Sequence, residues 1–140
     1  MSVDIKVRGY HLDIYQHVNN GRYLEFLEEG RWDYFEKKAF FIDLDAQQLA
    51  FVVANINISY RRPAYVGETI RVITKIVSIG NKSAKATQEV RLIKSGEVAD
   101  LIVDAVVTFC LMDDNSQKAV PISGEIRQSL ENMIEESKLS

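Results

Sequence analysis

The stretch NNGRYLEFLEEGRWDYFEKK, residues 19–38, decides the fold because it is the one long segment with helical periodicity. An asparagine at position 19 or 20 suits the N-cap of a helix. Glutamates lie in the early turns and lysines close the segment, the charge order that the helix macrodipole favours. A long helix is therefore predicted, with an apolar stripe made of Tyr23, Leu24, Leu27, Tyr34 and Phe35 and widened by Phe26 and Trp32.

The rest of the chain is dominated by strand patterns. Period-two alternation or β-branched residues mark five segments, and turn residues such as Gly80-Asn81 and Ser95-Gly96 separate the later ones. Ser123 can cap a short C-terminal helix that carries Ile126 and Leu130. The order predicts an α+β fold, in which an antiparallel sheet covers one long helix. The predicted strands are 3–7, 50–60, 69–79, 83–93 and 98–111.

Length and charge exclude several classes of protein. The 140 residues fit one domain, 1–140. A net charge of −3 gives no basic surface for nucleic acid. The longest apolar run, 101–112, is interrupted by Asp104 and is too short for a membrane span. The first residues lack the apolar run of a signal peptide, so a cytoplasmic location is expected.

The single cysteine, Cys110, excludes an internal disulfide and a metal site built on several cysteines. It lies in the most apolar predicted strand, where a thiol is more often an inert core group than a nucleophile. A sheet that covers one helix also leaves an edge strand and apolar surface exposed. Self-association would cover both, so we expect a homodimer or a homotetramer.

Chemically useful side chains concentrate in the loop before the long helix, residues 10–20, which holds two histidines, one carboxylate and three amides. A helix N-terminus presents unpaired N–H groups that can polarise a carbonyl. Asp13, the only acid in the loop, could attack that carbonyl or activate water. Alternatively, Asp13 makes only an Asx turn and His17 satisfies a loop carbonyl. The residues alone leave both interpretations open.

Other chemistries find less support in the sequence. No Gly-x-Ser-x-Gly elbow is present for a serine hydrolase. Residues 80–83, Gly-Asn-Lys-Ser, lack the earlier glycine of a phosphate loop. The spacing of His11, Asp13 and His17 matches none of the common metal-binding patterns. We therefore expect no metal and no cofactor.

Three motifs carry a resemblance to a known family: Asp13-x-x-x-His17-Val-Asn-Asn20-x-x-Tyr23, Asn57-Ile-Ser-Tyr-Arg-Arg-Pro-Ala64 and Val66-Gly-Glu68. Together they resemble the 4-hydroxybenzoyl-CoA thioesterase-like branch of the hotdog-fold thioesterases. The runs at 7–13 and 23–29 are most similar to bacterial long-chain acyl-CoA thioesterases of the thioesterase III type. The resemblance covers nearly the whole chain and implies a long helix wrapped in an antiparallel sheet, with active sites at a dimer interface.

The resemblance also implies roles for individual residues. Asp13 matches the catalytic carboxylate, acting as a nucleophile or as a general base on water. The backbone N–H around Asn20 matches the donor to the thioester carbonyl, and Tyr23 matches an aromatic position beside the active site. Lys82 and Ser83 match the position at which some relatives hold coenzyme A phosphates.

A second resemblance, to plant acyl-carrier-protein thioesterases, rests on residues 16–20 and 60–62. Tyr15 and Pro63 stand where that group has an Asn and a Glu of its proposed network, so its full catalytic relay cannot be transferred. His17 is kept and could orient Asp13 or a water, or brace the loop.

The expected function is hydrolysis of medium- to long-chain fatty acyl-CoA to fatty acid and CoA. Arg61 and Arg62 are candidates to contact the nucleotide, or they are solvated residues at a strand edge. The alternatives are an acyl-carrier-protein thioesterase and a non-catalytic acyl-binding protein of the same fold.

Overall fold

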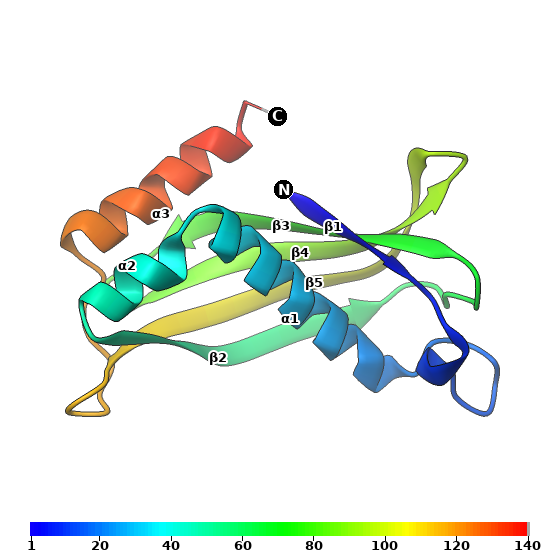
Figure 1. Cartoon of the computed structure of the whole chain (residues 1–140), viewed down its shortest axis with the longest axis horizontal. Coiled ribbons are helices and arrows are strands. Elements are labelled where there is room, and N and C mark those ends of the chain that lie inside the picture. The colour runs from blue at the N-terminus through cyan, green and yellow to red at the C-terminus, as the bar shows by residue number, and fades with distance from the viewer. Residues whose placement is uncertain (140) are drawn as a thin grey trace. The chain divides into compact units, whose positions relative to one another are not determined.

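The computed structural model describes residues 1–139, and the helices and strands in this range confirm the α+β class (Figure 1). One strand comes first and is followed by helices, four strands then follow in succession, and a last helix comes after them. The elements are β1 (Ser2–Lys6), the 3-10 helix η1 (Gly9–His11), α1 (Asn20–Lys37), α2 (Phe40–Ala46), β2 (Leu49–Tyr60), β3 (Thr69–Ile79), β4 (Ser83–Lys94), β5 (Glu97–Asp113) and α3 (Gly124–Ser137).

The strands form one five-stranded sheet in the order β1-β3-β4-β5-β2. Strand β1 pairs antiparallel with β3, and Val3 lies opposite Val72. Short turns join β3 to β4 and β4 to β5, which makes these neighbours antiparallel as well (Figure 1). Strands β1 and β2 are the two edges of the sheet.

Contacts along the chain divide it into two compact units, and several strands contribute to both. The N-terminal loop and most of α1 belong to the first unit, whereas α2 and α3 belong to the second. The first unit comprises Met1–Tyr34, Ile58–Thr74 and Gln88–Ala105, and the second comprises Phe35–Asn57, Lys75–Thr87 and the described residues from Val106 onward.

In the first unit, α1 buries a narrower face than the sequence predicts. Tyr23, Phe26 and Leu27 are buried, whereas Leu24 is 43% and Trp32 is 48% exposed. The two exposed residues were wrongly assigned to the stripe. The buried positions follow the i, i+3, i+4 spacing of one helix face, and both Leu24 and Trp32 fall outside it.

A buried polar group fixes α1 against the sheet within this unit. Gln88 on β4 is fully buried, and its Nε2 donates to the Leu27 carbonyl and to Thr74 Oγ1, both at 2.9 Å. Its Oε1 accepts from Arg31 Nη1 at 3.1 Å. Because every polar atom of this amide is paired, burying it is tolerated, and the pairs set where α1 crosses β3 and β4.

The second unit is held by aromatic packing. Phe35 lies 5.0 Å from Phe40 and 5.2 Å from Phe51, and Phe51 stacks on Phe109 at 4.5 Å between ring centroids. Helix α2 lies beside α3 (Figure 1). The sequence did not reveal α2, since it spans only seven residues and has no side-chain cap.

The C-terminal helix begins at the predicted place. Ser123 occupies the N-cap position of α3, but its side chain makes no capping hydrogen bond. Ile126, Leu130 and Met133 form the buried face. Across residues 1–139, none of the helices combines the length and apolarity that spanning a membrane requires.

Candidate active site

The beginning of α1 is fixed by Asn19. Its Oδ1 accepts a hydrogen bond from the Gly21 N–H at 3.0 Å, and its carbonyl accepts from the Arg22 N–H at 2.8 Å. The predicted cap is therefore confirmed at position 19. The Asn20 N–H, at the first helical position, has no acceptor within residues 1–139. It is available to a ligand, with the positive end of the helix dipole behind it.

This cap predicts a measurable contribution to stability. Asn19→Ala removes the side-chain acceptor, so we expect the free energy of unfolding to fall by about 1 kcal/mol. Urea denaturation followed by circular dichroism measures the loss. The neighbouring change Asn20→Ala is the control, since the Asn20 side chain makes no hydrogen bond within residues 1–139. Equal stability of the two variants would contradict the assignment of the cap.

A cleft of about 230 Å³ opens at this helix start. Three of the four residues predicted as catalytic, His17, Asn20 and Tyr23, line it, and Asp13 does not. All of the lining residues belong to the first unit. They are His17, Val18, Asn20, Tyr23, Tyr60, Arg62 and Pro63.

Tyr60, which ends β2, was not predicted as a site residue. Its hydroxyl donates to the Asn20 carbonyl at 3.3 Å, and its ring lies 5.7 Å from that of Tyr23. It therefore braces the first turn of α1 from across the cleft. The available signal was its place in the Tyr60-Arg61-Arg62 run that carries the family resemblance.

Asp13 lies half-buried in the loop before α1. Its Oδ1 accepts from the Tyr15 N–H at 2.8 Å, which forms an Asx turn. Its own N–H donates to the His17 carbonyl at 2.9 Å, so the backbone ties the two residues together. The second oxygen, Oδ2, makes no hydrogen bond within residues 1–139. The Asx turn thus orients the carboxylate and leaves one oxygen available for chemistry.

The His17 imidazole is held by rings rather than by hydrogen bonds. It stacks on Tyr15 at 6.2 Å and meets Tyr65 edge-on at 5.7 Å. It makes no hydrogen bond to a loop carbonyl in the described part of the chain. The alternative that His17 serves to satisfy a loop carbonyl therefore finds no support. His17 also lines the cleft.

The two arginines after β2 lie in different environments. Arg61 pairs with Asp104 at 3.1 Å and does not line the cleft. Arg62 lies 3.8 Å from a Glu68 oxygen and 3.9 Å from an Asp100 oxygen, too far for hydrogen bonds, and its Nη1 is buried without a hydrogen-bond partner in residues 1–139. Arg62 also lines a second cleft of about 410 Å³, to which Lys94 contributes.

Lys82 and Ser83 lie at the turn between β3 and β4, in the second unit. Lys82 is exposed and Ser83 is half-buried. Neither residue lines either of the two clefts. The structure therefore does not place them among the other predicted site residues.

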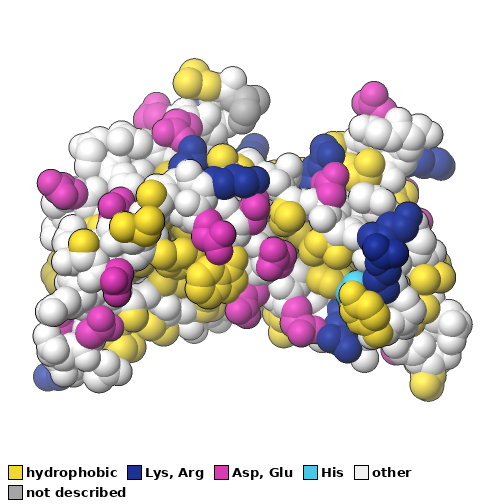
Figure 2. All heavy atoms as spheres, viewed as in Figure 1, with side chains coloured by type: hydrophobic (Ala, Val, Ile, Leu, Met, Phe, Trp, Pro, Cys, Tyr) yellow, Lys and Arg dark blue, Asp and Glu magenta, His cyan; other side chains and the backbone are white. Residues whose placement is uncertain are grey.

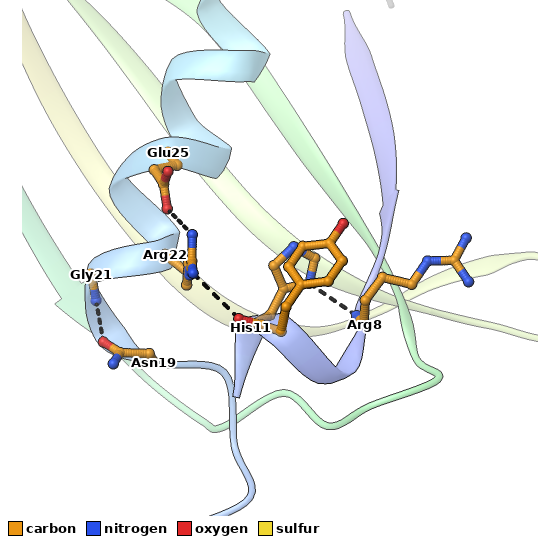
Figure 3. A network of polar contacts seen from close by, with 7 residues as sticks. Arg8, His11, Asn19, Gly21, Arg22 and Glu25 are labelled. Carbon is orange, nitrogen blue, oxygen red and sulfur yellow. Dashed lines mark hydrogen bonds and ion pairs between the residues drawn. The ribbon is translucent and has the colours of Figure 1, made fainter. Parts of the chain in front are cut away.

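A polar network around His11 supports the loop from the side of η1 (Figure 3). His11 Nδ1 accepts from the Arg8 N–H at 2.9 Å, and the His11 carbonyl accepts from the Asn19 N–H at 2.8 Å. Arg22 donates to the Tyr10 carbonyl at 3.3 Å and pairs with a glutamate of the next turn. On this face of the molecule, Lys and Arg side chains gather beside a histidine (Figure 2).

The pKa of His11 lies below its ordinary value of 6.5, chiefly because the residue is buried and next because of the positive charge of Arg22. Arg8 also lowers this pKa, and Glu25 raises it. The unfolded state therefore binds the proton first as the pH falls, so His11 removes stability from about pH 6.5 downward. We expect His11→Asn, whose amide oxygen can accept the Arg8 N–H, to flatten the decline in stability between pH 6.5 and 5. Urea midpoints across that range measure it, and an unchanged decline would contradict the role.

Tyr23 is the most enclosed residue of the cleft, with 2% of its surface exposed. The proton of its hydroxyl has no acceptor in residues 1–139, while the Ala64 backbone acts on the oxygen as a hydrogen-bond donor. Burial raises the pKa of Tyr23 to about 12, against a smaller opposing effect of the Ala64 backbone. The phenol therefore keeps its proton at neutral pH. In the described part of the chain, no group of three or more His, Cys, Asp or Glu side chains is arranged to hold a metal ion.

Comparison with known proteins shows which proteins the chain is similar to. Residues 7–130 match the family model of the thioesterase-like superfamily. The chain is 47% identical over 134 residues to the long-chain acyl-CoA thioesterase FadM of Escherichia coli (strain K12). The aligned region covers 96% of this chain and 99% of that protein.

Solved structures agree with the sequence match. The crystal structure of YbaW, a probable thioesterase from Escherichia coli, superposes with a TM-score of 0.86 at 47% identity and covers 96% of this chain and 98% of that one. A predicted thioesterase from Bacillus stearothermophilus gives a TM-score of 0.80 at 25% identity, with 95% of each chain covered. These similarities confirm the hotdog fold expected from the sequence.

Proposed function

The chain belongs to the thioesterase-like superfamily, and we propose that it hydrolyses acyl-CoA thioesters with medium- to long-chain fatty acyl groups. The observation that carries the proposal is the unpaired Asn20 N–H at the start of α1, in a cleft shared with His17 and Tyr23. The 47% identity to a long-chain acyl-CoA thioesterase supports this substrate class.

The proposed reaction begins with the thioester carbonyl oxygen accepting the Asn20 N–H. As a nucleophile attacks the carbonyl carbon, negative charge develops on that oxygen and the helix start stabilises it. The carbon–sulfur bond then breaks, and CoA leaves as a thiolate that takes up a proton. A thioester has weaker resonance than an ester or an amide, so one polarising group and one carboxylate suffice, and no cofactor is required.

Asp13 drives the attack by one of two routes. As a general base, its free Oδ2 takes a proton from the attacking water. As a nucleophile, it forms a mixed anhydride with the acyl group, which water then hydrolyses to fatty acid and the regenerated carboxylate. The Asx turn supports either route, because it holds Oδ1 and leaves Oδ2 unpaired. His17, tied to Asp13 through the backbone, is proposed to orient the carboxylate or the water.

For the CoA portion, Arg62 is better placed than Arg61. Arg62 lines both clefts and keeps a buried Nη1 without a hydrogen-bond partner within residues 1–139. Arg61 is held by two hydrogen bonds to Asp104, whereas the ion pairs of Arg62 with Glu68 and Asp100 are longer, at 3.8 and 3.9 Å. We therefore propose that Arg62 contacts a phosphate of CoA, while Lys82 and Ser83 keep only the support of the family resemblance.

The proposed working form is a cytoplasmic homodimer or homotetramer. Strand β2 is an edge of the sheet, with main-chain groups to pair. Leu24 and Trp32 leave apolar surface on α1 exposed. A second copy that covers these features would bring further groups to a site whose carboxylate lies outside the cleft of a single chain.

Thiol release measured with dithionitrobenzoate over a panel of acyl-CoA chain lengths tests the function. We expect turnover to rise from short to medium and long chains. Matched acyl-carrier-protein substrates test the alternative that the plant-like runs at residues 16–20 and 60–62 favour. Release from carrier-protein substrates alone would replace the proposal by that alternative, and saturable binding without release would identify a non-catalytic acyl-binding protein.

A further inference from the structure

The Tyr23 hydroxyl is a buried donor with nothing to donate to. The residue is 2% exposed, and its hydroxyl proton has no acceptor in residues 1–139, while the Ala64 backbone donates toward the oxygen. Leaving a buried hydroxyl unpaired costs about 1–3 kcal/mol. A phenylalanine would fill the same space without that cost, so packing alone does not explain a tyrosine here.

The position of Tyr23 indicates where an acceptor would lie. Tyr23 is in the first turn of α1, three residues after Asn20, and both residues line the same cleft. Across the cleft, Tyr60 already has an acceptor in the Asn20 carbonyl. Of these two tyrosine hydroxyls, only that of Tyr23 therefore has its proton free for a bound molecule.

Resting on the proposed function, we propose that the Tyr23 O–H is a second donor to the thioester carbonyl oxygen, beside the Asn20 N–H. As the carbonyl becomes an oxyanion, the hydrogen bond from the phenol becomes charge-assisted and shortens. No proton is transferred in this step. Tyr23 is then a catalytic residue through its hydroxyl, and its ring is a packing group.

The electrostatic surroundings favour a donor over a base. Burial disfavours the phenolate, so the hydroxyl remains protonated throughout the neutral range. The rings of Phe26 and Tyr60, both within 6 Å of the Tyr23 ring, fix its orientation. A donor held in this way costs little reorganisation when charge develops on the substrate.

Tyr23→Phe tests the proposal, because it removes one oxygen and keeps the ring. We expect kcat for a medium-chain acyl-CoA to fall about 100-fold, the scale of a lost oxyanion donor, with KM nearly unchanged. Unfolding by urea should require the same or more denaturant, since an unpaired buried hydroxyl is gone. Tyr34→Phe is the matched control: Tyr34 is a buried tyrosine of the same helix that does not line the cleft, and its variant should keep wild-type kcat.

The possible results distinguish failure of the proposed role of Tyr23 from failure of the proposed function. Wild-type kcat in Tyr23→Phe overturns the proposal and leaves thioester hydrolysis intact. A fall in kcat that is matched by a loss of stability assigns Tyr23 to structure and also overturns it. Replacing Tyr23 by the more acidic 3-fluorotyrosine supplies a second readout, since a donor role predicts that kcat is retained there and lost only in Tyr23→Phe. Absence of thiol release by the wild-type protein would instead overturn the proposed function.

Discussion

Asp13→Asn is expected to lower kcat for acyl-CoA hydrolysis by a factor of about 100 or more. The amide that replaces the carboxylate can neither accept a proton from water nor attack a thioester. Its oxygen can still accept the Tyr15 N–H, so the Asx turn survives the change. The free energy of unfolding should therefore remain close to that of the wild type, and the loss should appear in turnover alone.

The control for this experiment is Cys110→Ala. The Cys110 thiol is half-buried on β5, in the second unit, and lines neither cleft. Its removal should leave turnover near normal. Thiol-release kinetics and urea denaturation on both variants measure the two effects. Wild-type turnover in Asp13→Asn, with the fold intact, would show that this carboxylate does not drive the reaction.

Gly30→Ala is expected to cause the largest loss of stability, about 2–3 kcal/mol. An added Cβ would lie 2.5 Å from Val72 Cγ1 and 3.0 Å from Gln88 Nε2. Val72 is fully buried and its branched side chain has little freedom. Helix α1 must therefore move away from the sheet, or Gln88 must give up its bond to the Leu27 carbonyl.

Gly21→Ala is the matched control in the same helix. Its Cβ would lie 3.5 Å from Asn19 Oδ1, an ordinary contact, so this variant should be at least as stable as the wild type. Alanine favours a helix over glycine by about 1 kcal/mol, which would stabilise both variants if sterics played no part. Urea denaturation decides: a Gly30→Ala protein as stable as Gly21→Ala would contradict the close approach of α1 to β3 and β4.

Much of the fold follows from the sequence because its signals are local. The cap at Asn19 and the long helix after it appear in the structure nearly where the pattern predicts them. The strand predicted over 83–93 is observed as Ser83–Lys94. Helix α2 was missed because a seven-residue helix without a side-chain cap has too little periodicity to detect.

The buried face of α1 was predicted less well. Leu24 and Trp32 are apolar, yet hydrophobicity does not reveal which apolar residues a helix turns toward its sheet. The role of Gly30 on the buried face could not be predicted either. Its place on the buried face depends on the closeness of Val72, a contact between residues 42 positions apart that no local pattern encodes.

Some residues of the candidate site could be predicted from the sequence and others could not. The spacing brought His17, Asn20 and Tyr23 to one cleft, since a single loop and helix turn carry all three. Tyr60 joins them through the pairing of distant strands, so only its motif pointed to it. The Asx turn at Asp13 is compatible with both interpretations of that residue, because a carboxylate that caps one N–H keeps a second oxygen for chemistry.

A crystal structure of the Asp13→Asn variant with an unhydrolysed medium-chain acyl-CoA tests the central claim most directly. We predict that the thioester carbonyl oxygen lies about 3 Å from the Asn20 nitrogen, the distance of an N–H···O hydrogen bond. A thioester bound elsewhere, with its carbonyl oxygen out of reach of the first turn of α1, would contradict the claim that this helix start polarises the substrate.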